Sequence, residues 1–192
     1  ETNHNRYLSN PYTKANETYV VGDQYTSFNL APWRGTGVAI PVFSLKSESS
    51  FGVGDFGDLK KLVDWAQATK QKVIQILPIN DTTITHTWTD SYPYNSISIY
   101  AFHPMYIDLN QLPELKNKTQ RDRFKKLQKE LNQLPTVDYE AVNKGKWAYL
   151  KLLFKQEGKQ VLTSEGYRSF QDKNREWLQP YAVFSYLRDQ YG

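Results

Sequence analysis

The chain has 192 residues, and 15% of them are aromatic, which excludes a chain that is disordered throughout. The 24 Lys and Arg against 20 Asp and Glu give a mixed surface with a formal charge of +4, which argues against nucleic acid as a partner. There is no cysteine for a disulfide or a thiolate metal site, and no apolar run has the length of a signal peptide or a membrane span, so we expect a soluble cytoplasmic protein with no membrane partner.

Residues 1–32 are rich in Asn, Thr, Ser and Tyr and show no sustained hydrophobic period. This composition is typical of a linker. Because the chain also begins without a Met, we expect an excised piece of a longer protein in which residues 1–32 leave a preceding module.

A strand–helix–strand unit is expected next. The apolar runs 38–43 and 72–78 are typical of short strands buried on both faces, although Pro41 removes a ladder donor from the first. Asp55 precedes a helix over about 56–69, whose apolar residues recur at helical spacing: Leu59, Leu62, Val63 and Ala66. A crossover helix between two strands requires parallel pairing, so the fold class is α/β.

A long loop rich in Thr, Ser and Tyr follows at 79–103, and helical patterns come after it. One apolar face contains Phe124, Leu127, Leu131 and Leu134. A second helix is expected to begin near Asp138 and to carry Val142, Leu150, Leu153 and Phe154. A final helix is expected to enter at Pro180, since proline suits a first turn, and to carry Val183, Tyr186 and Leu187.

The segment 52–57, Gly-Val-Gly-Asp-Phe-Gly, matches the spacing of a dinucleotide-binding loop, which raises the alternative of a nucleotide-binding oxidoreductase. Three features oppose it. Residues 44–51 separate the strand from the glycines, Asp55 puts a carboxylate where a pyrophosphate would bind, and Lys61 lies on the helix that should pack closely on the sheet. We therefore expect a loop capped by Asp55 and no cofactor.

The three histidines are too scattered for a helical pair of metal ligands: His4, His86 and His103. We expect each to be structural or at the surface, and no metal site.

Three segments together resemble the start of the catalytic barrel of glycoside hydrolase family 77, the 4-α-glucanotransferases. They are Pro41–Leu45, Phe51–Gly57 and the Pro-Tyr-Asn-Ser sequence at 93–96. Trp177–Phe184 is similar to the helical insertion that follows the second strand in this family. Ile79–Thr82 and an extra residue within Asp90–Tyr94 resemble the plant-cytosolic and related bacterial branch, in which starch-binding modules precede the barrel.

The resemblance implies the first strand–helix–strand portion of a (β/α)₈ TIM barrel over residues 33–110, followed by a truncated helical insertion over 111–192 and hence an incomplete barrel. It implies retaining transfer of α-1,4-glucan segments between malto-oligosaccharides or glucans. The catalytic carboxylates belong to later strands in the family, so no catalytic residue is assigned to this chain, which is expected to be inactive alone. The nearby Asp55, Asp58 and Asp81 are interpreted as helix-start and loop residues.

An incomplete barrel exposes apolar faces and strand edges, so we expect the chain to dimerise, to swap elements between copies or to aggregate. A different alternative is a non-catalytic glucan-binding module that uses exposed aromatic residues.

The resemblance also assigns substrate-binding residues. The tyrosine that matches Tyr94 stacks on the sugar at the cleavage point in this family, and a tyrosine face suits the apolar C–H side of a glucose ring. Without the resemblance, a core tyrosine is the simpler interpretation. Asp90 and Ser91 are further candidates for sugar contact, with a role in holding the loop as the alternative.

Overall fold

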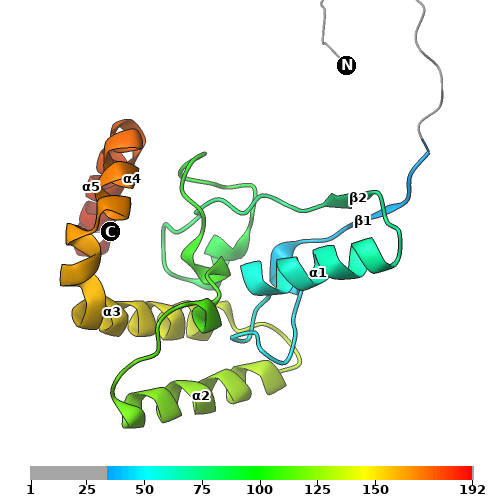
Figure 1. Ribbon diagram of the computed structural model, residues 1–192, viewed down its shortest axis with the longest axis horizontal. Helices are drawn as coiled ribbons and strands as arrows, with labels where there is room; N and C mark the ends of the chain where they lie inside the picture. The colour runs from blue at the N-terminus through cyan, green and yellow to red at the C-terminus, as the bar shows by residue number, and fades with distance from the viewer. Residues whose placement is uncertain (1–33, 192) are drawn as a thin grey trace, which may run out of the picture. The chain divides into compact units, whose positions relative to one another are not determined.

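The computed structural model describes residues 34–191, so the predicted linker at 1–32 lies outside the described part. The residues from Gly35 onward form one compact unit. In chain order this unit contains a small sheet with its crossover helix, a long loop region with short 3-10 turns, and the helices α2 to α5 (Figure 1).

The sheet consists of β1 (Gly37–Ala39) and β2 (Val73–Gln75), which pair in parallel with Gly37 opposite Val73. The predicted parallel pairing is confirmed. Both strands are shorter than the apolar runs, and the first run turns after Pro41 into the 3-10 turn η1 (Val42–Ser44), as expected where a proline ends a ladder.

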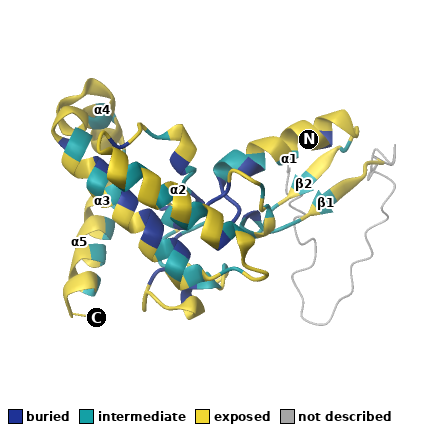
Figure 2. Ribbon diagram, turned by 90° about the horizontal axis from the view of Figure 1, so that it is seen from below, coloured by how far each residue is buried: buried dark blue, intermediate teal, exposed yellow. Residues whose placement is uncertain are grey.

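The prediction that these strands are buried on both faces is wrong for the described residues, since most of the paired positions are exposed (Figure 2). A parallel strand is buried on both faces only when helices cover each side of the sheet. Within residues 34–191, only α1 (Phe56–Ala68) lies alongside the two strands.

Helix α1 begins where the sequence predicted. The Asp55 carboxylate accepts hydrogen bonds from the amides of Gly57 (2.9 Å) and Asp58 (3.2 Å), and the Asp58 carboxylate accepts one from the Asp55 amide (3.3 Å). This capping box satisfies amides that would otherwise lack partners at the helix start. The expected apolar face is only partly covered: Ala66 is buried, whereas Val63 is 51% exposed.

The main core forms between α2 (Lys118–Gln133), α3 (Tyr139–Thr163), the loop that precedes α1 and the segment 109–115 that precedes α2 (Figure 2). Asp138 caps α3 through the Ala141 amide at 2.9 Å, which confirms the predicted helix start. The core contains Phe51, Val53, Leu109, Leu115, Leu131, Val142, Tyr149 and Leu153.

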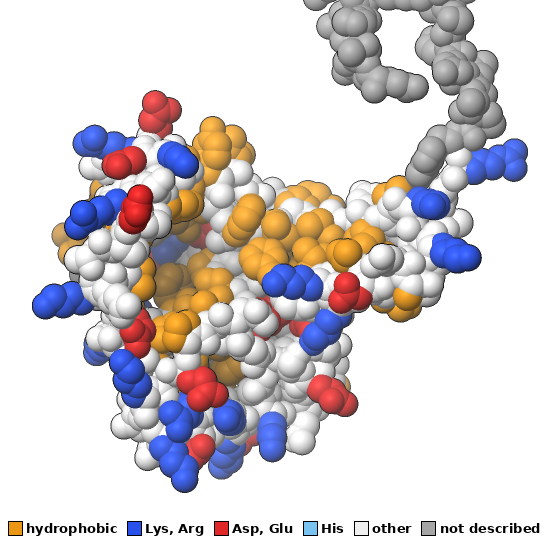
Figure 3. All heavy atoms as spheres, viewed as in Figure 1, with side chains coloured by type: hydrophobic (Ala, Val, Ile, Leu, Met, Phe, Trp, Pro, Cys, Tyr) orange, Lys and Arg blue, Asp and Glu red, His pale blue; other side chains and the backbone are white. Residues whose placement is uncertain are grey.

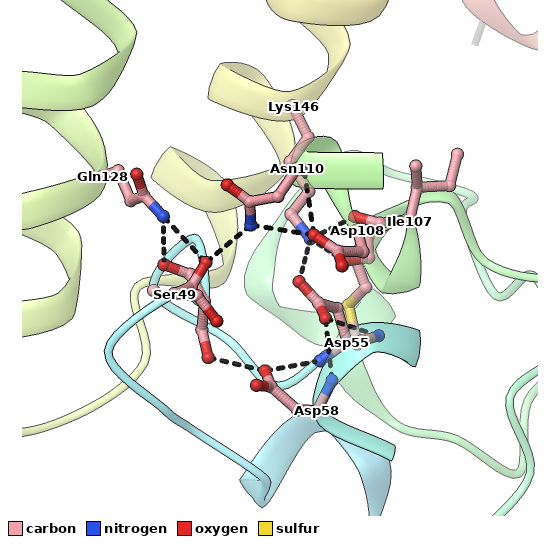
Figure 4. A network of polar contacts seen from close by, with 12 residues as sticks. Ser49, Asp55, Asp58, Ile107, Asp108, Asn110, Gln128 and Lys146 are labelled. Carbon is pink, nitrogen blue, oxygen red and sulfur yellow. Dashed lines mark hydrogen bonds and ion pairs between the residues drawn. The ribbon is translucent and has the colours of Figure 1, made fainter. Parts of the chain in front are cut away.

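A buried lysine joins α3 to the start of α1 (Figure 4). Lys146 is 1% exposed, donates to the carbonyls of Met105 (2.6 Å) and Ile107 (2.8 Å), and lies 3.7 Å from the Asp55 carboxylate. Burial lowers the pKa of Lys146 to about 8, although the neighbouring carboxylates act in the opposite direction. Helix α3 is thus joined to the strand–helix–strand unit by a charged, desolvated contact.

The chain ends in α4 (Glu165–Lys173) and α5 (Arg175–Tyr191). The prediction that the last helix enters at Pro180 is wrong, because α5 begins at Arg175 and includes Pro180 in its second turn. The Asn174 carbonyl accepts the Leu178 amide at 2.9 Å, so the helix starts upstream, and the proline removes a single hydrogen bond, to the Glu176 carbonyl. No helix within residues 34–191 combines the length and apolarity needed to cross a bilayer.

Candidate functional site

The 79–103 loop leaves the carboxyl end of β2 and returns along itself. The Asp81 amide donates to the Ala101 carbonyl (2.8 Å), the Ile97 amide to the Asp81 carbonyl (2.8 Å), and the His103 amide to the Ile79 carbonyl (2.9 Å). These bonds pair the two ends of the loop in antiparallel fashion. The loop therefore has an ordered base that continues from the sheet.

Asp90 organises the tip of this loop. Its carboxylate is buried and accepts hydrogen bonds from the backbone amides of Ile84 (3.1 Å), Thr85 (3.0 Å) and His86 (2.7 Å). His86 has a φ of +60°, a conformation that non-glycine residues adopt rarely and that this carboxylate helps to hold. These three amide hydrogen bonds go to one carboxylate oxygen, and the other accepts the Thr85 hydroxyl at 3.1 Å. Both Asp90 oxygens are thus engaged by the loop itself, and direct sugar contact by this residue stays a prediction.

Tyr94 lies on the surface of the loop, and its ring is 60% exposed. It lies next to Tyr92, which is 61% exposed, with the ring centroids 5.6 Å apart. Tyr94 is therefore not part of the core of the described unit, and its contact with sugar stays a prediction. Ser91 is half-buried at the end of the 3-10 turn η2 (Trp88–Ser91), so all three predicted substrate residues come from one short segment.

The surface around this loop is rich in hydrophobic side chains. Figure 3 shows them gathered over the middle of the described unit, beside a hollow that the C-terminal helices border. The exposed aromatic residues of the loop are Trp88, Tyr92, Tyr94, Tyr100 and Phe102. Flat apolar rings with adjacent polar groups are suited to binding the faces of sugar rings.

A cavity of about 490 Å³ adjoins the loop tip on the side of α3. The Trp88 amide donates to the Glu140 carboxylate at 3.0 Å, which joins the loop to this helix. The cavity is lined by His86, Glu140, Asn143, Lys144, Trp147, Ala148 and Lys151. The buried Asn143 Oδ1 has no hydrogen-bond partner among the described residues. Sequence reasoning missed this cavity, because its lining comes from two distant segments.

Helix α5 contacts the base of the loop through side chains that the sequence reading also missed. The Tyr181 hydroxyl donates to the buried Asp81 carboxylate at 2.5 Å, and the Arg188 guanidinium donates to the Thr83 carbonyl at 2.7 Å. Tyr100 of the loop stacks on Trp177, with ring centroids 5.6 Å apart and an interplanar angle of 21°. No local sequence pattern predicts contacts between residues about one hundred positions apart.

His103 is buried at the end of the loop and is structural, as expected. Its Nδ1 accepts the Met105 amide at 3.1 Å, and burial lowers its pKa. Within residues 34–191, no three His or carboxylate side chains come together in an arrangement that could hold a metal ion.

The glycines of the 52–57 segment have packing roles. A Cβ on Gly54 would lie 2.0 Å from the Val42 carbonyl oxygen, and one on Gly57 would lie 2.2 Å from the Asp108 carboxylate. The helix-start amides that a pyrophosphate would need already donate to Asp55. The geometry therefore argues against the nucleotide-binding alternative.

Comparisons with a family model and with known proteins indicate the same family. Residues 40–192 match the family model described as 4-alpha-glucanotransferase. The chain is 44% identical over 159 residues to the 4-alpha-glucanotransferase DPE2 of Oryza sativa subsp. japonica, covering 83% of this chain and 17% of that protein. It is 35% identical over 153 residues to the 4-alpha-glucanotransferase of Chlamydia caviae, covering 79% of this chain and 28% of that protein. The chain thus spans less than a third of the length of these relatives.

Proposed function

Because the chain belongs to the 4-alpha-glucanotransferase family, we propose that it forms part of an enzyme that transfers α-1,4-glucan segments between malto-oligosaccharides or glucans. The expected barrel has its active site at the carboxyl ends of its strands, and the 79–103 loop leaves the carboxyl end of β2. This chain then supplies the first two strands of a TIM barrel, a sugar-binding loop and the helical insertion.

The observation that carries the proposal is the exposed ring pair of Tyr92 and Tyr94 on a loop held by Asp90. Exposed apolar side chains that lie together mark an interaction site, and aromatic rings suit the apolar face of a sugar. Tyr94 is the proposed platform beneath the reacting sugar. Asp90 positions the loop, and Ser91 is placed to contact a sugar hydroxyl.

The proposed reaction is a retaining double displacement, which needs two carboxylates about 5–5.5 Å apart, one as nucleophile and one as acid/base. In this proposal they come from other strands of the barrel, so the 192-residue chain binds and orients substrate but breaks no glycosidic bond. No cofactor takes part. The absence of cysteine is compatible with a reducing compartment, and the cytoplasm is the proposed location.

The cavity beside the loop tip offers room for further sugar residues. Trp147 supplies an aromatic face, and Glu140 and the two lysines supply hydrogen-bonding groups. This composition also fits the alternative function, a glucan-binding module without catalysis. Glucose release from maltotriose by the intact enzyme separates the two, because a binding module releases none.

Tyr94 variants of the intact enzyme test the platform. Tyr94→Ala removes the tyrosine ring and should lower kcat/KM for maltotriose, with a loss of transition-state stabilisation of about 2–4 kcal/mol. The loss is expected because the contact strengthens as the sugar ring distorts toward the transition state. Tyr94→Phe keeps the aromatic ring and removes the hydroxyl, which can bond a sugar oxygen or a carboxylate. It should lose about 1–2 kcal/mol of transition-state stabilisation, as expected for one hydrogen bond.

Tyr191→Ala is the matched control, since it removes another exposed tyrosine, at the end of α5. It should leave kcat/KM unchanged. Melting temperatures of all variants separate a lost contact from a lost fold. An unchanged kcat/KM in a folded Tyr94→Ala enzyme would rule out the platform.

A further inference from the structure

Helix α5 is far from the 79–103 loop in sequence, yet it reaches the loop at several points. Tyr181 binds the Asp81 side chain, Arg188 binds the Thr83 carbonyl, and Trp177 stacks on Tyr100. A fourth contact joins His86 Nε2 to the Asp189 carboxylate at 3.0 Å. These four contacts reach both sides of the loop base and its tip.

The contact between Tyr181 and Asp81 differs from the others because its acceptor is a buried carboxylate. Asp81 is 2% exposed, and its other carboxylate oxygen accepts both the amide (3.0 Å) and the hydroxyl (2.6 Å) of Thr83. Burial raises the pKa of the Tyr181 hydroxyl, and the Asp81 carboxylate raises it further, so the phenol stays protonated and donates. Removing the donor leaves a buried carboxylate with an unfilled position.

Hydrogen bonds to the carbonyl groups of Asp81 and Asp90 connect the Tyr181 contact to the rest of the loop. The Asp81 carbonyl accepts the Ile97 amide on the return side of the loop. The Thr82 hydroxyl donates to the carbonyl of Asp90, whose carboxylate in turn holds the amides of the tip. Tyr94 lies between these two anchors. A shift at Asp81 therefore displaces the segment that presents the Tyr94 ring.

We propose that α5 sets the position of the sugar-binding loop, with Tyr181 and Arg188 as positioning residues that act through Asp81 and Thr83 on Tyr94. This inference rests on the proposed function, in which Tyr94 is the sugar platform. It assigns to the last helix of the insertion a role in substrate binding that involves no contact with the sugar.

The first test measures amide hydrogen exchange in the 192-residue chain. Tyr181→Phe removes only the hydroxyl and keeps the ring beside Trp177. It should speed exchange at the amides of residues 83–86 and 97 by about tenfold, the size expected for one hydrogen bond to a charged group. Tyr186→Phe makes the same change at an exposed position of α5 and should leave these rates within about twofold.

Arg188→Met provides an independent variant, because it removes the donor to the Thr83 carbonyl, and Arg188→Lys restores a single donor. Faster exchange in Arg188→Met with recovery in Arg188→Lys supports the proposal. Exchange rates that match those of the unaltered chain in both Tyr181→Phe and Arg188→Met overturn it.

The second test is a double-mutant cycle in the intact enzyme. Tyr181→Phe alone should lower kcat/KM for maltotriose by about tenfold, and should lower it little further when Tyr94 is already Ala, because the helix acts through that ring. A residue that only stabilises the fold would give additive effects, and additivity therefore contradicts the proposal.

The two hypotheses fail in different ways. If Tyr94→Ala leaves kcat/KM unchanged, the platform and the functional half of this inference are both overturned, while the exchange rates still decide whether α5 holds the loop. If Tyr94→Ala lowers kcat/KM but Tyr181→Phe changes neither activity nor exchange, the platform stands and the role of α5 is overturned.

Discussion

The buried imidazole of His103 lies at the base of the 79–103 loop. The charged groups that act on it are Asp81, Asp90, Lys146 and Arg188. Burial is the largest influence and lowers the pKa of His103 below its ordinary value of 6.5, whereas the two carboxylates act in the opposite direction. Its Nδ1 accepts the Met105 amide and is therefore unprotonated in the folded chain.

This arrangement predicts a loss of stability in acid. The unfolded chain takes up a proton at His103 near pH 6.5, and the folded chain does so only at lower pH, so the free energy of unfolding falls as the pH drops through this window. His103→Asn keeps an oxygen for the Met105 amide but does not titrate. Urea unfolding between about pH 7 and pH 5 should show a smaller pH dependence for the variant. An identical pH dependence in both proteins would contradict the assignment.

Tyr94 and Asp90 illustrate what a loop sequence can and cannot reveal. The family resemblance indicated both residues, but it left open whether each contacts sugar or supports the loop. The structure places the Tyr94 ring in solvent and the Asp90 carboxylate against three loop amides. This difference depends on how the backbone of residues 84–86 turns around the carboxylate, which the residue types alone do not specify.

The start of helix α1 is stabilised by the Asp55 carboxylate, which has partners in two elements. Asp55 caps the first turn and also faces the buried ammonium of Lys146. Burial raises the pKa of Asp55, and Lys146 acts in the opposite direction. The cap is a local feature that was predictable from sequence, whereas the partner on α3 was not.

Two variants separate these roles in the free energy of unfolding. Asp55→Asn keeps a cap acceptor but leaves Lys146 without its counter-charge, and should destabilise the chain by about 3 kcal/mol. Asp55→Ala also removes the cap, which should add about 1 kcal/mol. Asp64→Asn, at an exposed position of α1, is the control and should have little effect. In a Lys146→Met background the Asp55→Asn effect should shrink, and an unchanged effect would exclude the ion pair.

The C-terminal helix shows where element prediction failed. Proline is common in first turns, which predicts a helix start at Pro180, but α5 begins five residues earlier. The proline removes one hydrogen bond and crowds the preceding turn, yet the helix continues through it and its side chains Trp177, Tyr181 and Arg188 contact the loop. Tertiary contacts therefore outweighed the local preference.

At the scale of the whole molecule, large apolar side chains remain uncovered. Val73 on β2 and Trp65 on α1 are both exposed, and a groove of about 690 Å³ on α3 is lined by residues that include Leu150, Phe154 and Val161. Within residues 34–191 the two-stranded sheet also has unpaired edges. Such surfaces favour association with further protein.

We therefore expect the 192-residue chain to self-associate. Light scattering should show a mass that rises with protein concentration, as a dimer, an exchange of elements or aggregates. Val73→Lys puts a charge on the exposed strand and should shift the equilibrium toward the monomer, because charged side chains disfavour edge pairing. A stable monomer across a broad concentration range would show that the exposed edges and groove do not associate.

Local signals in the sequence were enough to determine the parallel strand–helix–strand unit, the capped starts of α1 and α3, and the family resemblance. Each depends on residues close together in the chain, such as Asp55 with Asp58 or Asp138 with Ala141. Only the tertiary structure decided how Lys146, Asp81 and the α5 side chains are used. The contacts of Tyr181 and Arg188 with the loop join residues 100 and 105 positions apart. Their geometry arises when α5 packs on the 79–103 loop, so no local pattern can encode them.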